Sequence, residues 1–355
     1  MDHLHLSNRL SGRINNFDVL RYFAAVLVIY SHSYPLTGKS IEPLALLSKG
    51  QWTFGGVAVA IFFVISGFLV SNSFERSTVL QYTVNRFLRI FPGLFMAVLL
   101  SVFVLGPLFT SLEISEYFSN NLTYSYLNNS LLLSVQYVLP GMFETNLYPN
   151  AVNGSIWTIP YEILGYILVA IIGYYGLLKK KKSVLLIFIM IFIFSQILPG
   201  KYHVINIKGF LVGSLLELIL FFLMGVIFYA YRESIVLKRS IALICVSILT
   251  TTFFSGQFKT AFLFCGTYLI FYFVYHPNIK LHRFSKWGDF SYGLYIYAFP
   301  VQQIVQLLMH NQESPIINFF ISFILTSVLA FLSWHLVEKQ ALKLKFSIWD
   351  KSKTS

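Results

Sequence analysis

Charged residues are scarce in this 355-residue chain, because Asp, Glu, Lys and Arg together make up 11% of it. A soluble globular protein carries about a quarter of its residues charged. Hydrophobic residues reach 56%, and the mean hydropathy is +0.69. This composition excludes an ordinary soluble domain and predicts an integral membrane protein.

Cysteine is almost absent, since only Cys245 and Cys265 occur and both lie inside apolar runs. Two cysteines are too few for a disulfide framework, and no ligand cluster surrounds them, so we interpret them as small buried hydrophobes. No spacing typical of a metal site appears, and no metal cofactor is predicted. A cleavable signal peptide is not predicted either, because the first apolar run is long, contains Arg21 and His32 and lacks a small-residue cleavage site.

Long apolar runs, in contrast, are abundant. A transmembrane helix needs about 20 mainly apolar residues. Ten segments approach this length: 18–36, 55–74, 87–110, 158–178, 183–199, 209–231, 240–255, 259–276, 290–310 and 315–337. We therefore predict an all-α polytopic bundle of about ten transmembrane helices. It would form one membrane domain, 18–337, between an N-terminal segment, 1–17, and a tail, 338–355. A further run, 130–143, is too short to span and is interpreted as re-entrant or interfacial.

Acidic residues are few, with 14 against 26 Lys and Arg. If the N-terminus is cytoplasmic, twenty of these cations fall in cytoplasmic segments and five in outer loops. This bias predicts that both termini are cytoplasmic. We expect a helical membrane protein of this kind to lie in the cell's inner (plasma) membrane. The bias also accounts for the net charge of +12, so the basic composition does not indicate nucleic-acid binding, and no RNA-binding motif occurs. No internal repeat of the kind found in many transporters is visible.

The longest outer loop, about 111–157, contains three Glu and no Lys or Arg, and it is rich in Asn, Ser and Tyr. Such side chains hydrogen-bond to sugars and stack on them. The alternative is an ordinary interfacial loop.

The first predicted span contains Asp18, Arg21 and His32, although ionisable side chains inside a membrane are costly. Arg21 and His32 are eleven residues apart, which places them on one helix face and about 16 Å apart along the axis. Singly, Arg21 could snorkel to the headgroups and His32 could make an interfacial hydrogen bond. Their shared face favours a joint role.

Several segments resemble, in order, motifs of the membrane acyltransferase 3 family, whose members modify bacterial glycans. The first is the Arg21–His32 spacing. The others are FFVISGFL at 62–69, RFLRIFP at 86–92, GSIWTIPYE at 154–162, SYGLY at 291–295 and SWHLVEK at 333–339. The resemblance covers about 15 to 342. The chain departs from the family at Phe299, where many members have a His before the Pro of the ninth helix. The soluble esterase-like domain of some members is not expected.

The resemblance implies an O-acyltransferase that moves an acyl group, most commonly acetyl, from cytoplasmic acetyl-CoA to a hydroxyl of a surface polysaccharide or lipid-linked glycan. Its partners would be acyl-CoA, the glycan acceptor and the lipid bilayer. The main alternative is a transporter or flippase of a lipid-linked sugar without acyl transfer. That alternative predicts broken helices or repeats and leaves the Arg21–His32 spacing unexplained. A structural subunit of a glycan-export complex is a weaker one.

The predicted topology suggests where the donor binds. Arg86 and Arg89 lie at the cytoplasmic start of the third helix and are candidates for binding its phosphates, or else ordinary positive-inside residues. Arg21 lies deeper and would hold the pyrophosphate or the start of the pantetheine arm, which is about as long as the Arg21–His32 separation. Ser66-Gly67, like Gly55-Gly56, would either permit close helix packing or leave room for that arm. Ser66 is thus a candidate substrate-binding residue.

His32 is the candidate general base, because the attacking sugar hydroxyl must lose a proton. Glu162, at the start of the fourth helix, would orient His32 or bind the acceptor, although the helix dipole alone also favours an acid there. Trp157 would stack on a sugar ring or anchor the chain at the interface. His335, near the cytoplasmic end of the last helix, is expected to be structural.

Overall fold

The computed structural model describes residues 6–7, 15–132, 135–198, 200, 204–207, 210–281, 284–312 and 314–351. Most of the predicted segment 1–17 lies outside these ranges, as do six of the cations counted above: Arg9, Arg13, Lys201, Lys208, Arg283 and Lys353. The chain divides into two units. Unit 1 comprises Met1–Ala24, Pro43–Val79 and Tyr161–Trp287, and unit 2 comprises Ala25–Glu42, Leu80–Pro160 and Gly288–Ser355.

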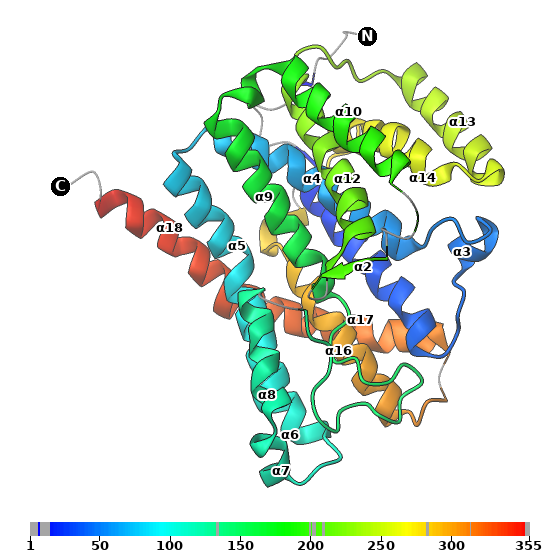
Figure 1. Cartoon of the computed structure of the whole chain (residues 1–355), viewed down its shortest axis with the longest axis vertical. Helices are drawn as coiled ribbons and strands as arrows, with labels where there is room; N and C mark the ends of the chain where they lie inside the picture. Colours follow the sequence, from blue (N-terminus) through cyan, green and yellow to red (C-terminus); the bar gives the residue numbers. More distant parts are fainter. Residues whose placement is uncertain are drawn as a thin grey trace. The chain divides into compact units, whose positions relative to one another are not determined.

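A helix occupies each of the ten predicted spans (Figure 1). They are α2 (Phe17–Leu36), α4 (Phe54–Glu75), α5 (Val79–Leu100), α9 (Ile159–Tyr174), α10 (Lys181–Ile197), α12 (Val212–Ala230), α13 (Arg239–Ser255), α15 (Thr267–Val274), α16 (Ser291–Leu308) and α17 (Pro315–Ser333). α5 continues through the π-helical turn η1 (Ser101–Leu105) into α6 (Gly106–Phe109), and α14 (Phe258–Ala261) with η5 (Phe262–Gly266) precedes α15.

Among the described residues, five helical stretches are long and apolar enough to cross a membrane: Phe54–Glu75, Val79–Phe109, Ile156–Tyr174, Val212–Ala230 and Pro315–Lys345. The remaining short elements are α3 (Pro43–Leu47), α7 (Ile114–Ser119), α8 (Asn121–Ser125), η2 (Tyr126–Leu131), η3 (Ile156–Thr158), η4 (Leu177–Lys179) and η6 (Phe284–Trp287). One strand pair, β1 (Asn206–Ile207) and β2 (Phe210–Leu211), completes the described elements. The prediction of a helical protein with membrane-type helices is therefore confirmed.

Unit 1 is built around the close packing of α4 against α12. A Cβ atom on Gly67 would lie 1.9 Å from the carbonyl oxygen of Phe222, and one on Gly225 would lie 2.1 Å from that of Val64. Each glycine therefore faces the backbone of the opposite helix. Small residues that let backbones approach this closely are a common packing device between membrane helices. For Gly67, packing is thus the role that the structure supports.

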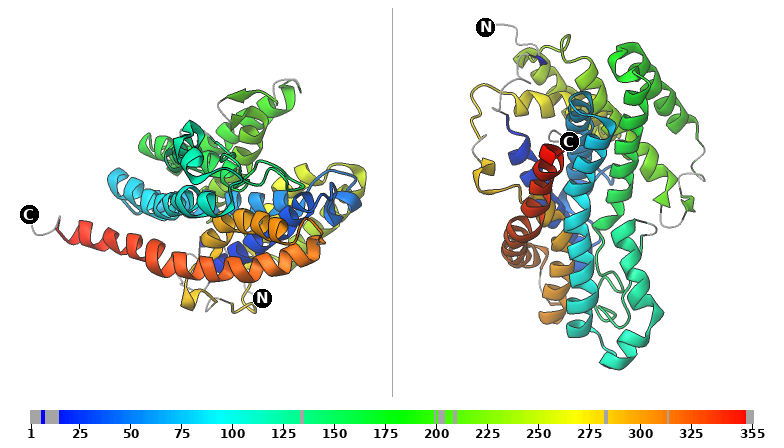
Figure 2. Two further views of the ribbon diagram at one scale, coloured as in Figure 1. Left: turned by 90° about the horizontal axis from the view of Figure 1, so that it is seen from below. Right: turned by 90° about the vertical axis from the view of Figure 1, so that its left-hand side faces the viewer.

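Unit 2 contains α5, the segment 111–158, α16 and α17. The backbone of Ala330 on α17 lies close to Gly293 on α16, where a Cβ would come within 2.8 Å of the Ala330 Cα. α17 runs through the π-helical turn η7 (Trp334–Glu338) into α18 (Lys339–Lys351), and Figure 2 shows the three as one long curved helix. The predicted tail therefore begins within a helix.

The run 130–143 is not helical beyond η2 in the part that the structure describes. Residues 135–139 have no regular structure, and a turn follows at Pro140 and Gly141, where Gly141 has a φ of +69°. Thr110 Oγ1 donates to the carbonyl of Pro140 at 2.8 Å. This run belongs to the irregular segment that leads to the candidate site.

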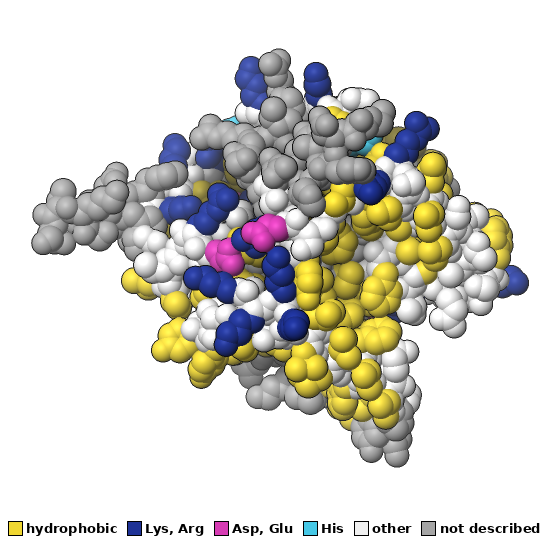
Figure 3. Space-filling model, turned by 90° about the horizontal axis from the view of Figure 1, so that it is seen from above, with side chains coloured by type: hydrophobic (Ala, Val, Ile, Leu, Met, Phe, Trp, Pro, Cys, Tyr) yellow, Lys and Arg dark blue, Asp and Glu magenta, His cyan; other side chains and the backbone are white. Residues whose placement is uncertain are grey.

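Large hydrophobic side chains are exposed along many helices, as expected for a surface in contact with lipid. On α10, for example, Met190 and Phe194 are 53% and 54% exposed. Figure 3 shows hydrophobic side chains over much of one face, with Lys and Arg far more frequent there than Asp and Glu.

Candidate active site

A pocket of about 590 Å³ lies in unit 2, where α2, the irregular segment 137–157 and α16 come together. Its aromatic lining consists of Tyr137, Tyr148, Trp157 and Phe299, and its other lining residues include His32. Ligand pockets of small molecules typically measure about 300–1,000 Å³. The volume is therefore sufficient for a sugar residue.

His32 reaches the pocket from the last turns of α2 and is partly buried. Its ring makes an edge-to-face contact with Phe299, with centroids 5.2 Å apart and an interplanar angle of 78°. Its Nδ1 atom is buried and has no hydrogen-bond partner among the described residues. A buried imidazole nitrogen without a partner is costly in a protein interior. His32 therefore lacks the satisfied hydrogen bond at Nδ1 that a purely structural histidine would have.

The opposite wall of the pocket is an irregular segment that packs on α16. Gly154, in the GSIWTIPYE motif, lies so close to Phe299 that a Cβ would come within 2.4 Å of its ring. Asn153 Nδ2 donates to the carbonyl of Ile296 at 2.8 Å, and Thr158 Oγ1 and the Tyr295 hydroxyl are 2.6 Å apart. Phe299, where the chain departs from the family pattern, thus contacts both His32 and this wall.

The structure shows a buried acid, Glu42, whose contact with the residue preceding His32 was not predicted. Glu42 is 4% exposed, and its carboxylate accepts a hydrogen bond from the hydroxyl of Ser31, which directly precedes His32. Glu42 lies in a loop between two predicted helices, so no helical spacing in the sequence related it to Ser31. Only the return of that loop onto α2 reveals the contact.

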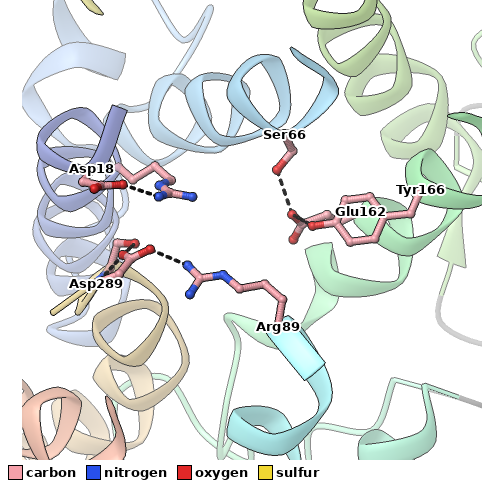
Figure 4. Close-up of polar contacts among 8 residues, drawn as sticks. Asp18, Ser66, Arg89, Glu162, Tyr166 and Asp289 are labelled. Atoms are coloured by element: carbon pink, nitrogen blue, oxygen red, sulfur yellow. Dashed lines mark hydrogen bonds and ion pairs between the residues drawn. The ribbon is translucent and has the colours of Figure 1, made fainter. Parts of the chain in front are cut away.

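Glu162 is held by two hydroxyl groups in unit 1 (Figure 4). It lies in the first turn of α9, as predicted. Its Oε1 accepts hydrogen bonds from Ser66 Oγ at 2.8 Å and from the Tyr166 hydroxyl at 2.5 Å. Two of the predicted site residues, Ser66 and Glu162, are therefore in direct contact. Tyr166 was missed, although its position four residues after Glu162 placed it on the same helix face.

Two of the three predicted donor-binding arginines hold carboxylates (Figure 4). Arg21 pairs with Asp18, one turn earlier on α2. Arg89 Nη2 lies 2.6 Å from Asp289 Oδ2, and the other oxygen of Asp289 accepts a hydrogen bond from Ser291 Oγ at 2.6 Å. A phosphate bound by either arginine would compete with its carboxylate. Arg86 lies one turn before Arg89 on α5 and is partly buried.

The predicted site residues thus fall into two groups. His32, Trp157, Arg86 and Arg89 belong to unit 2, and His32 and Trp157 line one pocket. Arg21, Ser66 and Glu162 belong to unit 1. The helix α2 contains both Arg21 and His32. At 1.5 Å per residue, their eleven-residue separation along this helix remains about 16 Å. Among the described residues, no group of three or more His, Cys, Asp or Glu is placed to hold a metal ion.

Comparison with known proteins places this arrangement in a family. The acyltransferase domain model of the acyltransferase 3 family matches residues 14–335, so the chain belongs to that family. It is similar to an O-acetyl transferase of Shigella phage Sf6, with 31% identity over 92% of this chain and 96% of that protein. It is also similar to nodulation protein 10 of Rhizobium leguminosarum bv. viciae, with 26% identity over 95% of this chain and 96% of that protein. No solved structure matches.

The protein is therefore an O-acyltransferase with apolar, membrane-type helices. The family and the phage relative both favour this enzyme over the transporter that the composition alone left open.

Proposed function

We propose that this protein transfers an acyl group, specifically acetyl, from cytoplasmic acetyl-CoA to a hydroxyl of a bacterial surface polysaccharide or lipid-linked glycan. The enzyme would lie in the inner membrane as one membrane domain with ten spans, and both termini would be cytoplasmic. Support for this topology comes from the helices at all ten predicted segments and from the twenty cations against five. The name of the phage relative supports the choice of acetyl.

The observation that carries the proposal is the position of His32 in the wall of the aromatic pocket. Aromatic faces contact the apolar faces of sugar rings, and the Tyr148 ring, which is 43% exposed, is available for such a contact. A sugar held there would present a hydroxyl to the imidazole. We therefore assign the pocket to the acceptor and a stacking role to Trp157.

The chemistry follows from these assignments. His32 accepts the proton of the acceptor hydroxyl as its oxygen attacks the carbonyl carbon of the thioester. A C–O bond forms, the C–S bond breaks, and the thiolate of coenzyme A leaves and takes up a proton from the imidazolium. The result is an acetyl ester and free coenzyme A.

For Glu162 we propose a catalytic role, either in stabilising the imidazolium or in binding the acceptor. Its carboxylate is already oriented by Ser66 and Tyr166, which reduces the cost of ordering it during the reaction. In this scheme Ser66 acts on the substrate through Glu162.

The donor would be bound by Arg21, Arg86 and Arg89, with coenzyme A phosphates on the cytoplasmic side. Asp18 and Asp289 already neutralise two of these side chains. Donor binding would then open or share the Arg89–Asp289 pair.

The test is transfer of radiolabelled acetyl from acetyl-CoA to polysaccharide extracted from the host strain, measured in membrane vesicles that contain the full chain. We expect label in the polysaccharide with wild type, and a loss of at least about 100-fold in His32→Gln because general-base catalysis is worth about that much.

His335→Gln is the matched control, because His335 also packs on a phenylalanine ring, with centroids 4.2 Å apart from Phe331, but lies outside the pocket. Full activity of His32→Gln would show that the assigned base is wrong. Failure of wild type to label any glycan would reject the proposed reaction.

A further inference from the structure

Three glutamines lie on the apolar helix α16, and their side chains are completely buried: Gln302, Gln303 and Gln306 each have 0% exposure. A buried amide is costly unless its donors and acceptors are satisfied. The partners of such an amide therefore show which part of the structure depends on it.

Gln303 holds the irregular wall of the pocket. Its Nε2 donates to the carbonyl oxygens of Tyr148 and Ala151, each at 2.8 Å. Its Oε1 accepts a hydrogen bond from Asn146 Nδ2 at 2.8 Å. Both N–H groups and the oxygen of the side chain are thus used by one segment of the chain.

The two carbonyls that Gln303 binds are the ends of a stretch that lines the pocket. Residues 148–151 all contribute to the lining and belong to no helix or strand. Backbone carbonyls in such a segment need partners from elsewhere in the protein. Gln303 supplies them for Tyr148 and Ala151, so its side chain connects both ends of this stretch to α16.

Gln302, the preceding residue, contacts the other wall. Its Nε2 lies 2.8 Å from the carbonyl oxygen of Ile29 and 2.8 Å from Ser33 Oγ. These two residues flank His32 within one turn of α2. Phe299, one turn earlier on α16, contacts the His32 ring and is also edge-to-face with Tyr148, with centroids 6.1 Å apart.

We propose that Gln302 and Gln303 are positioning residues, of which Gln302 orients the helical turn that contains His32 and Gln303 holds the acceptor-binding wall at residues 148–151. This inference rests on the proposed function, because it assigns the pocket to the acceptor. It assigns different effects to two adjacent amides: Gln302 would affect catalysis and Gln303 would affect acceptor binding.

The experiment measures kcat and both KM values in vesicles that contain the full chain, with labelled acetyl-CoA and a dilution series of the host polysaccharide. Gln303→Glu keeps the acceptor for Asn146 but removes both donors to the wall. It should raise KM for the polysaccharide about tenfold, with kcat at saturation and KM for acetyl-CoA nearly unchanged. Gln302→Leu should lower kcat about tenfold and leave both KM values nearly unchanged, because a small displacement of a catalytic group is enough for such a loss.

Gln306→Leu is the matched control. Gln306 has the same burial on the same helix, but its Nε2 donates to Asn311 Oδ1, at 2.9 Å, and not to residues 148–151. Asn311 in turn contacts the backbone of Thr145 and Leu147, which do not line the pocket. Gln306→Leu should therefore change the polysaccharide KM much less than the Gln303 variants do. Gln303→Met, which has no charge, is measured beside Gln303→Glu, and the amount of monodisperse protein is determined by size exclusion for every variant.

Equal effects of the Gln302, Gln303 and Gln306 variants on kcat and KM would overturn the inference, as would an unchanged polysaccharide KM in both Gln303 variants. Loss of folding in both Gln303 variants but not in Gln306→Leu would assign Gln303 to stability alone and would also overturn it. In each of these cases wild type still transfers acetyl, so the proposed function stands. Absence of transfer by wild type would reject both.

Discussion

The carboxylate of Glu162 offers the sharpest test of the proposed mechanism, because its two hydroxyl partners can be removed singly without touching the acid. The Tyr166 hydroxyl donates to Oε1 at 2.5 Å and Ser66 Oγ donates to the same atom at 2.8 Å. A hydrogen bond to a charged group contributes about 1.5–3 kcal/mol. If the oriented carboxylate acts in the transition state, Tyr166→Phe should lower kcat by about 10- to 150-fold.

The assay is single-turnover transfer of labelled acetyl in membrane vesicles, with saturating acetyl-CoA. Ser66→Ala should lower kcat by a factor in the same range. The double variant should lose less than the product of the two single losses, since both hydroxyls orient one oxygen atom. Tyr174→Phe is the matched control, because Tyr174 lies on the same helix and is 73% exposed.

A wild-type rate in the double variant would refute the reasoning, because the carboxylate would then have no required orientation. A fall in kcat that accompanies an equal loss of thermal stability in Tyr166→Phe would assign the tyrosine to folding instead. Glu162→Gln, which preserves the shape of the side chain, should lose at least as much activity as either hydroxyl variant.

Three further predictions concern packing, donor and acceptor. Gly67→Val should prevent normal folding of unit 1, because its Cβ would meet the Phe222 carbonyl at 1.9 Å. A thermal-unfolding midpoint equal to that of Gly200→Ala, where no atom of the described residues lies within 4 Å of the added Cβ, would contradict this. Arg86→Ala should raise KM for acetyl-CoA about tenfold and leave the polysaccharide KM unchanged, since a phosphate contact affects the donor alone; the opposite pattern in initial rates would place Arg86 elsewhere. Trp157→Ala should raise the polysaccharide KM about tenfold with the acetyl-CoA KM constant. If Trp157 is only an interfacial anchor, neither KM will change.

Much of the fold could be predicted because a membrane simplifies the problem. Backbone polar groups inside the bilayer must find hydrogen-bond partners within the protein, and a helix provides them within one segment. A long apolar run therefore predicts a helix. The runs 240–255 and 315–337 were predicted on hydropathy alone, and helices begin at Arg239 and Pro315. The spacing of Arg21 and His32 could also be read directly, because both residues lie on the single helix α2.

The irregular parts of the site were not predictable in the same way. The segment 135–155 has no periodicity, and the carbonyls at both ends of its stretch 148–151 are bound by Gln303, more than 150 residues away in the chain. Glu42 was overlooked for the same reason, since its contact with Ser31 requires the loop to return onto α2. The role of Gly67 could not be chosen from the sequence, because a glycine can serve close helix packing or leave space for a ligand. The backbone of Phe222 on α12, next to Gly67, indicates close packing.

The sequence by itself determined the membrane class, the helices, and the resemblance that identified an acyltransferase, because these depend on composition, local hydropathy and the order of short motifs. Only the tertiary structure decided that His32 and Trp157 line one aromatic pocket, that Ser66 donates to Glu162, and that Arg89 is held by Asp289. Those relations join residues far apart in the chain, and the local forces that form a helix contain no information about which of its neighbours will satisfy a buried polar group.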